Sequence, residues 1–553
     1  MNKKYLLRLE FNWREVLFIF IDKLYKRQRI LYVTSVLFTI MILLVIRIYI
    51  LQVYPSEKVQ SSYQNHQEEK ITNLDYMILD TNGRDMMKYD KKYVLVIDLK
   101  PFSLNNYEET LEDLMALNFI MKSDNPKFNY SDVMKQTGKV YYDITENTYN
   151  KINKLKNIKG IYTYISDTID VKKAWSIGNM LSKIFEGDHQ KGTIEGELYD
   201  YLKDNQTPEA EFYLDNKAVY SKQSVSVSDQ NRNLRLTIDK DVQDKVDEVL
   251  HSDEYGYLNN IGVIIMESST GKIKCMAQKD ESEANINLGI EQMGYEPGSI
   301  YKIITLSSAL DCGLININDT YVCRGDICKT PHGKITIEKA FEISCNDVFA
   351  QIGAKLGYDK LVEYSKEQGL YNRVLNFCGD NRNEAVGIIP DEEAGISNIA
   401  IGQCMNVTPI QMLGAINTIV NDGVYEKPYV IEAILDKDEN IVKEFNSEEK
   451  KVYSETTAKI VQNAMKQVVK SGTGKKAYID NMNIGGKTGS STGNNGKTHG
   501  WFIGYFIKDN KKYTMVVFTP DIEEIKDANN NDAGGGDTAA PIFKNIVEKL
   551  CSK

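Results

Sequence analysis

The 553-residue sequence has few cysteines and no excess of basic charge, and these shortages exclude whole classes of protein. Eight cysteines in so long a chain are too few for a disulfide-dense scaffold. Lysine and arginine total 67 against 77 aspartates and glutamates, so the chain lacks the basic face of a nucleic-acid-binding protein. With 42% hydrophobic residues, it is neither a collagen-like fibre nor a disordered chain. Its length predicts two to four folded domains.

One long apolar run is present, and it follows a basic segment. Residues 1–30 carry eight basic and three acidic side chains, whereas residues 31–53 contain a single charged residue, Arg47. At about 1.5 Å per residue, this run is long enough to cross a hydrocarbon core of about 30 Å. The positive-inside rule then predicts a cytoplasmic tail over 1–30, one transmembrane helix over 31–53, and an extracytoplasmic remainder. The alternative is a cleaved signal peptide, although the run exceeds a typical signal core and no small-residue cleavage site follows it.

Residues 54–230 form a region without a catalytic constellation. The region begins with a polar stalk and continues with short helical stretches that are rich in lysine, asparagine and tyrosine. Two apolar runs, 76–79 and 93–99, flank the turn-forming Asn82-Gly83, which predicts a hairpin or a pair of strands. We interpret 54–230 as a spacer domain between the membrane and the rest of the chain.

Residues 234–553 have a more regular pattern, in which strands at both ends enclose helices. The pattern predicts a helix over 242–250 capped by Asp239, a hairpin over 261–277, strands over 500–506 and 513–519, and a terminal helix over 541–550. Strands at both ends of one segment indicate a single α+β domain whose ends meet in the same sheet.

The sharpest local feature is Ser299 followed by Lys302, directly after Pro297-Gly298. Pro-Gly ends the preceding element, so Ser299 is expected at the N-terminus of a new helix, where unpaired N–H groups favour a developing negative charge. The i, i+3 spacing places the lysine on the same helix face as the hydroxyl. A lysine whose pKa is lowered can take the proton of a serine nucleophile.

Two further motifs follow in a fixed order. Ser344-Cys345-Asn346 lies 45 residues after Ser299, and Lys487-Thr488-Gly489-Ser490 lies a further 143 residues on. Together with Ser299 and Lys302, they resemble the Ser-x-x-Lys, Ser-x-Asn and Lys-Thr-Gly signature of penicillin-recognising acyl-serine transferases.

The resemblance covers most of residues 234–550 and is to class B penicillin-binding proteins. Four further segments resemble their transpeptidase domain: Leu-Thr-Ile-Asp at 236–239, Gly-Gln at 402–403 with Thr-Pro at 408–409, His-Gly-Trp-Phe at 499–502, and Ala-Ala-Pro at 539–541. The resemblance implies an α+β penicillin-binding transpeptidase fold, with an antiparallel sheet flanked by helices over 234–553. It also implies an N-terminal pedestal or dimerisation-type domain over 54–230 and one transmembrane helix.

The resemblance also implies a role for each motif residue. Ser299 would attack the penultimate D-Ala carbonyl of a stem peptide, with Lys302 as the base and Ser344 as the proton relay toward the leaving D-Ala. Asn346 would hold the substrate amide, and the backbone N–H groups of Ser299 and Ser490 would form the oxyanion hole. Lys487, Thr488 and Gly489 would complete the site beside the substrate carboxylate. The result would be a peptidoglycan cross-link, and β-lactams would acylate the same serine.

The sequence departs from this family in places. Ser490 stands where threonine is commoner, and the pedestal motifs at 78–83 and 192–197 match only loosely. A glutamate-rich glycosyltransferase motif is absent, which indicates a monofunctional transpeptidase. The implied partners are peptidoglycan stem peptides, β-lactams, the membrane and a polytopic glycan polymerase, with no nucleic acid.

A second constellation lies between the first two motifs. Cys323, Cys328 and His332 fall within ten residues, beside Asp326, and Zn²⁺ takes such ligands tetrahedrally. Asp326 is the first candidate for a fourth ligand, and Cys345 is the second. The alternatives are a Cys323–Cys328 disulfide or two free thiols. The acyl transfer itself needs no cofactor, and the cysteines at 275, 312, 378 and 404 fall in apolar runs that predict burial.

Other functions remain open. A D,D-carboxypeptidase or β-lactamase would share the acyl-serine but release it with water, and class A β-lactamases use a separate glutamate that the sequence does not show. A β-lactam sensor would need a larger cytoplasmic part, and a scaffold would have lost the catalytic residues. Cross-linking therefore fits the sequence best.

Overall fold

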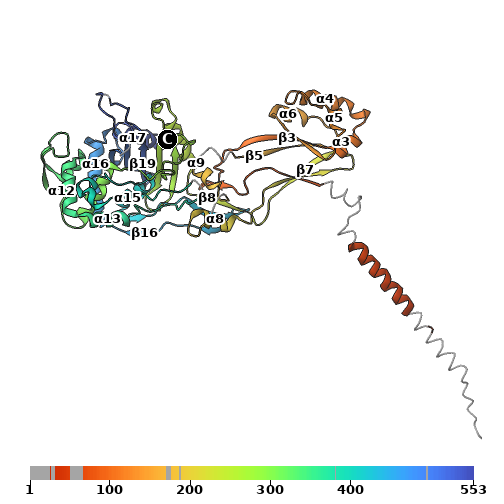
Figure 1. The fold of residues 1–553 in the computed structure, drawn as a ribbon, viewed down its shortest axis with the longest axis horizontal. Coiled ribbons are helices and arrows are strands. Elements are labelled where there is room, and N and C mark those ends of the chain that lie inside the picture. Colours follow the sequence, from red (N-terminus) through yellow and green to blue (C-terminus); the bar gives the residue numbers. More distant parts are fainter. Residues whose placement is uncertain are drawn as a thin grey trace, which may run out of the picture. The chain divides into compact units, whose positions relative to one another are not determined.

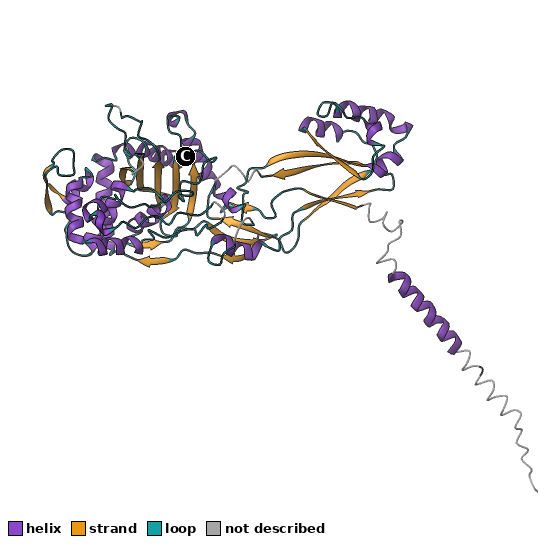
Figure 2. Cartoon of the chain, in the orientation of Figure 1, coloured by secondary structure: helices purple, strands orange, loops and turns teal. Residues whose placement is uncertain are grey.

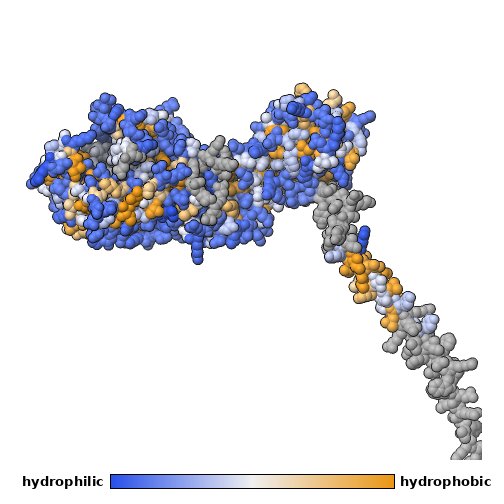
Figure 3. Space-filling view, in the orientation of Figure 1, coloured by the Kyte–Doolittle hydropathy of each residue, from blue (hydrophilic) through white to orange (hydrophobic). Residues whose placement is uncertain are grey.

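The computed structural model of the chain describes residues 25, 31–49, 66–169, 176–185, 189–379, 382–493, 496–527 and 529–552. Leu31–Tyr49 form a helix of 19 residues that is long and apolar enough to cross a membrane. Its exposed apolar side chains stand out in Figure 3. The helix fits the predicted single-pass anchor. The predicted tail over 1–30 apart from Tyr25, residues 50–53 of the predicted span, and the stalk up to residue 65 lie outside the described residues.

The described residues divide into two compact units. The first contains Val94–Tyr164, Ala210–Val225 and the described residues up to Glu69. The second contains the described residues of Lys70–Tyr93, Ile165–Glu209 and Ser226–Lys553. The segment predicted as one pedestal, 54–230, therefore contributes to both units. The predicted domain boundaries themselves stay predictions.

The first unit contains two three-stranded sheets and a group of short helices. The sheets have the strand orders β4-β3-β5 and β1-β6-β7. Their strands are β1 (His66–Lys70), β3 (Asp90–Asp98), β4 (Lys139–Ile144), β5 (Ile161–Thr168), β6 (Glu209–Leu214) and β7 (Tyr220–Ser226). The helices are α3 (Leu99–Asn105), α4 (Leu111–Met121), α5 (Tyr130–Val133) and α6 (Glu146–Ile152).

A five-stranded antiparallel sheet, seen among the helices in Figure 2, forms the centre of the second unit. Its strand order is β10-β9-β19-β18-β17, so the two predicted pairs of strands lie side by side although some 240 residues separate them in the sequence. The strands are β9 (Gly262–Glu267), β10 (Ile273–Gln278), β17 (Gly485–Thr492), β18 (Thr498–Lys508) and β19 (Lys511–Thr519). The predicted hairpin and the predicted meeting of the two ends in one sheet are confirmed.

Helices cover both faces of this sheet, as Figure 1 shows. One face carries α9 (Lys240–Leu250) and α17 (Ala539–Cys551), and the Asp239 side chain caps α9 by accepting from the Asp241 N–H. The opposite side holds α10 (Lys302–Asp311), α11 (Ile337–Glu342), α12 (Asn346–Leu356), α13 (Tyr358–Glu367), α14 (Ile396–Ile399), α15 (Pro409–Val420) and α16 (Glu455–Ser471). The α+β class predicted from the sequence, an antiparallel sheet flanked by helices, is thereby confirmed.

Side chains of the sheet alternate between two hydrophobic cores, because successive residues of a strand point to opposite faces. On β9, Val263 and Ile265 join the core that includes α9 and α17. Ile264 and Met266 join the other core, with α10, α12 and α15. Burial on both faces explains why this strand is continuously apolar in the sequence.

Both apolar runs around Asn82-Gly83 form strands, β2 and β3, but a second sheet of this unit contradicts the hairpin alternative. Its order is β15-β14-β8-β2, with β2 (Ile78–Leu79), β8 (Arg232–Leu236), β14 (Ile431–Asp436) and β15 (Ile441–Glu444). β2 runs parallel to β8, whereas β3, the other predicted half of the hairpin, pairs with β4 and β5. The long-range pairing is supported by buried Asp80, which accepts the Lys240 N–H at 3.1 Å and pairs with Arg84 at 2.7 Å.

The loosely matched motif at 192–197 also packs within the second unit. Thr193 caps α8 (Ile194–Leu202), and Glu195 is buried. Both carboxylate oxygens of Glu195 accept the Cys378 N–H at 3.1 Å. A buried carboxylate needs such partners. The hydrogen bonds of Glu195 therefore fix α8 to the loop around Cys378 within the second unit.

Candidate active site

Ser299 lies in a short turn that runs into a buried helix. The 3-10 turn η3 (Gly298–Tyr301) leads directly into α10, whose first residue is Lys302. Gly298 has a φ of +54°, and a β-carbon there would lie 2.5 Å from the Ser490 carbonyl oxygen. Only glycine permits this approach, so the turn holds Ser299 close to strand β17.

Two buried lysines meet at the hydroxyl of Ser344. Lys302 Nζ lies 3.2 Å from Ser344 Oγ and donates to the Asn346 Oδ1 at 2.6 Å and to the Ser344 carbonyl at 2.8 Å. Lys487 Nζ lies 2.9 Å from the same hydroxyl. Both lysine side chains are fully buried. The Ser-x-x-Lys, Ser-x-Asn and Lys-Thr-Gly motifs are therefore joined by one hydrogen-bond network.

The environment of the two lysines favours the neutral amine. Burial lowers the pKa of Lys302 to about 7. Burial, and next the positive charge of Lys302, lower the pKa of Lys487 well below its usual value. Two ammonium groups that share one hydroxyl repel each other, which penalises double protonation. One of the two amines can therefore accept a proton near neutral pH.

Ser344 itself has a strained backbone. Its φ is 60°, which is uncommon for a residue other than glycine and is often found at functional sites. Its neighbour Asn346 begins α12, and Cys345 precedes that helix as its cap residue. In this conformation the Ser344 hydroxyl and the Asn346 amide oxygen both contact Lys302 Nζ, and α12 holds Asn346 in place.

A cavity of about 400 Å³ brings the motifs together. Its wall contains Ser299, Ser344, Thr488, Gly489 and Ser490. β17 is an edge strand, paired on one side with β18, so its other edge is available to a ligand backbone. The structure thus gathers all the predicted catalytic residues. Five line the cavity, Lys302 and Lys487 donate to the Ser344 hydroxyl, and Asn346 accepts from Lys302.

The structure adds wall residues that the sequence interpretation missed. The hydroxyls of Thr473 and Thr488 lie 2.7 Å apart. The Gly535 N–H donates to Ser490 Oγ at 3.0 Å, and Asp537 also lines the cavity. The signals in the sequence are the small-residue run Ser471–Gly474 and the glycine run at 534–536.

The predicted metal-ligand residues also lie together in the structure, except that Cys345 takes the place of Asp326. Ligand atoms of Cys323, Cys328, His332 and Cys345 all lie within 4.8 Å of one another. The Cys328 and Cys345 sulfurs are 3.7 Å apart, and Cys323 Sγ is 3.3 Å from His332 Nδ1. Asp326, the first candidate for the fourth position, is not in this cluster, and Cys345 stands there instead. The side chain of Asp326 is exposed.

A buried carboxylate explains why Asp326 points away. Asp347 accepts the backbone N–H groups of five consecutive residues, 324–328, at 2.7–3.0 Å. Burial alone would raise the pKa of Asp347, but these bonds hold it well below its usual range. The loop therefore wraps its backbone around Asp347 and turns the Asp326 side chain outward.

The other cysteine predictions are corrected in part. All eight cysteines are free, so no disulfide joins Cys323 to Cys328. Cys275 is buried as expected, whereas Cys312 and Cys404 are exposed. Cys312 follows the end of α10 and Cys404 lies in the loop between α14 and α15, where an apolar run in the sequence does not imply burial.

Comparisons with known proteins agree with this geometry. Residues 261–548, just over half of the chain, match the family model of the penicillin binding protein transpeptidase domain. Stage V sporulation protein D of Bacillus subtilis is 28% identical over 517 residues, which cover 85% of this chain and 77% of that protein. The penicillin-binding protein PbpB of Mycolicibacterium smegmatis is 26% identical over 366 residues, which cover 58% of this chain and 54% of that protein.

Solved structures show the same fold. Penicillin binding protein 2X of Streptococcus thermophilus has a TM-score of 0.62 at 17% identity, covering 88% of this chain and 80% of that one. A peptidoglycan synthetase of Bifidobacterium adolescentis has a TM-score of 0.58 at 20% identity, covering 88% of this chain and 96% of that one. The matched family, the relatives and the three assembled motifs confirm the resemblance seen in the sequence. The chain belongs to the penicillin-binding protein transpeptidase family, as a class B member.

Proposed function

We propose that the chain is a membrane-anchored serine D,D-transpeptidase that cross-links peptidoglycan stem peptides through an acyl group on Ser299. The observation that carries this proposal is the convergence of Lys302 and Lys487 on the Ser344 hydroxyl, beside a cavity that Ser299 lines. A nucleophile, a base whose pKa lies near 7 and a hydroxyl relay are the parts that acyl transfer requires.

In the proposed mechanism, Ser299 Oγ attacks the carbonyl carbon of the penultimate D-Ala. Lys302 takes the serine proton, and Ser344 passes a proton to the departing amine as the C–N bond breaks. The backbone N–H groups of Ser299 and Ser490 stabilise the oxyanion. The amine of a second stem peptide then attacks the ester, loses a proton and frees Ser299, so one amide bond replaces another.

β-Lactams would acylate Ser299 in the same way, but the acyl group would not be transferred to an amine. Ser299 would open the β-lactam amide, but the leaving nitrogen stays tethered to the acyl group and blocks the entry of an amine. The adduct therefore persists, which distinguishes a transpeptidase from a β-lactamase that hydrolyses it.

The test of cross-linking is the fate of a donor pentapeptide that ends in D-Ala-D-Ala. We would incubate the full chain in detergent with this donor and a peptide that carries a free side-chain amine. We expect an amide-linked dimer and free D-Ala by mass spectrometry. Free D-Ala with only a shortened monomer would identify a carboxypeptidase instead, and no release of D-Ala from a folded protein would favour the scaffold.

The proposal places residues 1–30 in the cytoplasm and the catalytic domain outside. Its support is the basic segment that precedes the apolar helix Leu31–Tyr49. A transpeptidase without a glycosyltransferase motif makes no glycan strands of its own, and the sequence shows no such motif. We therefore propose that a polytopic glycan polymerase supplies them.

Gly402 provides a test of how the nucleophile's turn is held. A β-carbon at Gly402, where φ is +80°, would lie 2.1 Å from the Gly298 carbonyl, and the Gly298 N–H donates to the Gly402 carbonyl at 3.0 Å. We expect Gly402→Ala to displace this turn and to slow acylation by a fluorescent penicillin at least tenfold, since small misplacements cost large factors in rate.

The matched control is Gly357→Ala. Gly357 has a similar φ of +84°, but nothing lies within 4 Å of its added β-carbon. This variant bears only the backbone strain, about 1 kcal/mol of stability, and should be acylated at the wild-type rate. Equal rates for Gly402→Ala and wild type would contradict the role given to this contact.

We also propose that the cluster of three thiols and His332 binds one structural zinc ion. In a tetrahedron with Zn–S bonds of about 2.3 Å, two sulfurs stand about 3.8 Å apart. The 3.7 Å between Cys328 and Cys345 fits this value. Because Cys345 lies between Ser344 and Asn346, coordination there would fix the backbone of the Ser-x-Asn motif.

Metal removal should therefore be measurable as lost stability. We expect one zinc per purified full chain by elemental analysis. A chelator, or Cys328→Ser, should remove the metal and lower Tm by about 5 °C, the shift that corresponds to about 2 kcal/mol in a large domain.

Cys312→Ser removes an exposed thiol outside the cluster and should retain both zinc and Tm. A wild-type chain without metal that melts at the same temperature with and without added zinc would rule the proposal out.

A further inference from the structure

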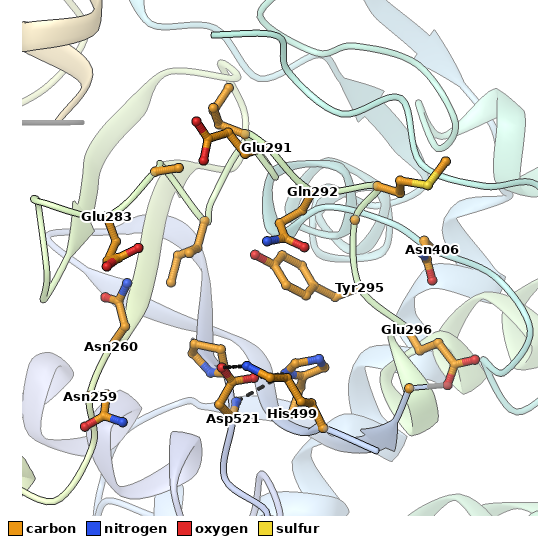
Figure 4. A pocket seen from close by; sticks show the side chains of 18 of the residues that line it. Asn259, Asn260, Glu283, Glu291, Gln292, Tyr295, Glu296, Asn406, His499 and Asp521 are labelled. Atoms are coloured by element: carbon orange, nitrogen blue, oxygen red, sulfur yellow. Dashed lines mark hydrogen bonds and ion pairs between the residues drawn. The ribbon is translucent and has the colours of Figure 1, made fainter. Parts of the chain in front are cut away.

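A cavity of about 820 Å³ that Ser299 does not line lies in the second unit, and Figure 4 shows the side chains around it. Polar groups such as those of Asn259, Gln292 and His499 make up much of its wall, so water can satisfy them without a ligand. An exposed apolar surface has no such solution, because water cannot hydrogen-bond to it. The first unit carries such a surface on α4, which Figure 1 labels.

The helix α4 is apolar on two separate faces. The first face packs into the unit through three buried residues, Leu114, Leu117 and Met121. The second face carries Leu111, Met115 and Phe119, which are 45%, 61% and 82% exposed. Because residues four apart are neighbours on a helix surface, these three form one continuous apolar stripe. Exposed apolar surface of this kind marks an interaction site.

Opposite charges lie at the two ends of this stripe. The turn η1 (Glu108–Thr110) runs directly into α4, so Glu108 lies seven residues before Met115, and Lys122 lies seven residues after it. At about 100° per residue, both side chains fall within the arc of about 80° that the stripe occupies. Both residues are exposed, and in the part of the chain that the structure describes neither side chain has a hydrogen bond or an ion pair.

We propose that this face of α4 binds the same face of a second copy of the chain, with the two helices antiparallel about a two-fold axis at Met115. In this arrangement Leu111 of each copy contacts Phe119 of the other, and Glu108 of each copy faces Lys122 of the other. A parallel arrangement would instead place like charges together, which is unfavourable. The stripe and its charges are therefore complementary to an antiparallel copy of themselves.

The apolar helix Leu31–Tyr49 compensates for the small size of such an interface. Two helices of this length bury less area than the roughly 1,200–2,000 Å² of a stable interface, so they associate weakly when both chains are free in solution. Anchors in one bilayer confine both copies and raise their effective concentration. The dimer is therefore expected in lipid vesicles and not in dilute detergent.

The test is cross-linking of the full-length Met115→Cys chain in phosphatidylglycerol vesicles with a short bismaleimide, which joins two thiols only where they lie close together. A residue on the two-fold axis lies beside its own counterpart, so we expect a covalent dimer on a denaturing gel. Asn150→Cys, at an exposed position of α6, is the matched control and should give at least fivefold less dimer. The wild-type chain gives the background from the natural cysteines.

Charge reversal tests the antiparallel register. In the Met115→Cys chain, Glu108→Lys and Lys122→Glu should each reduce the amount of dimer at least threefold, because each places like charges together at both ends of the interface. The two reversals combined should restore the dimer, since each pair then has opposite charges again. All three positions are exposed, so the Tm should stay unchanged in every variant.

Equal cross-linking of Met115→Cys and Asn150→Cys would overturn the proposal, and so would a dimer that is insensitive to both single reversals. Loss of the dimer in the double reversal, at an unchanged Tm, would overturn the antiparallel register. A water-soluble maleimide distinguishes a lipid contact: a Met115→Cys thiol that is shielded from it without forming a dimer would place this face on the bilayer and exclude the second copy.

Discussion

The Ser299→Ala chain is expected to form no covalent adduct with a fluorescent penicillin, whereas the wild-type chain is labelled to one adduct per molecule. Ser299 is the one serine of the Ser-x-x-Lys motif, and it lines the 400 Å³ cavity with Ser344 and Ser490. Alanine removes the attacking oxygen, so the covalent pathway has no first step. Intact-mass spectrometry of both chains measures the effect directly.

The matched control is Ser307→Ala on α10, the helix that follows the turn of Ser299. Ser307 is buried, and its hydroxyl donates to the Ile303 carbonyl at 2.7 Å. Its loss changes one local hydrogen bond and should leave the acylation rate within a factor of two, since such bonds contribute about 1 kcal/mol to folding. An adduct on Ser299→Ala at the wild-type level would mean that another residue is the nucleophile.

Lys302→Met is expected to slow acylation by about 10²–10⁴-fold, the range associated with loss of a general base. Methionine fills a similar volume, so the fully buried position remains packed. The substitution removes the amine that contacts Ser344 and Asn346. Stopped-flow labelling with the fluorescent penicillin measures the rate, and an unchanged Tm separates a chemical effect from unfolding. A rate within threefold of wild type would transfer the role of base to Lys487.

The same base sets the pH dependence of acylation. Since burial lowers the pKa of Lys302 to about 7, the amine is protonated below that pH and cannot accept the serine proton. The rate should rise about tenfold per pH unit up to about pH 7 and level off above it. In Lys302→Met this rise should disappear. A wild-type rate that is flat from pH 5.5 to 8.5 would contradict the assignment.

Local features of the site could be predicted from the sequence because they depend on neighbouring residues. Pro297-Gly298 ends one element, so Ser299 and Lys302 had to begin the next one, and the structure has a turn and a helix there. The convergence of Ser344 and Lys487 on Lys302 is different. It depends on how α10, α12 and β17 pack, and it could be predicted only through the resemblance to a known family.

The sequence interpretation was wrong where the structure depends on contacts between residues that lie far apart in the sequence. The run at 76–79 pairs with β8, more than 150 residues away, rather than with its neighbour across Asn82-Gly83. Asp326 was favoured as a metal ligand because it lies between the two cysteines. Asp347 binds the backbone of that loop, a role that the spacing of residues in the sequence does not indicate. The fourth member of the cluster is therefore Cys345 and not Asp326.

The most direct test of the account is to locate the penicillin on the chain. The wild-type full chain would be labelled, digested with trypsin and sequenced by tandem mass spectrometry. The account predicts one penicilloyl group, on Ser299. A group on Ser344 or on any other residue, or no group on a folded chain, would contradict it.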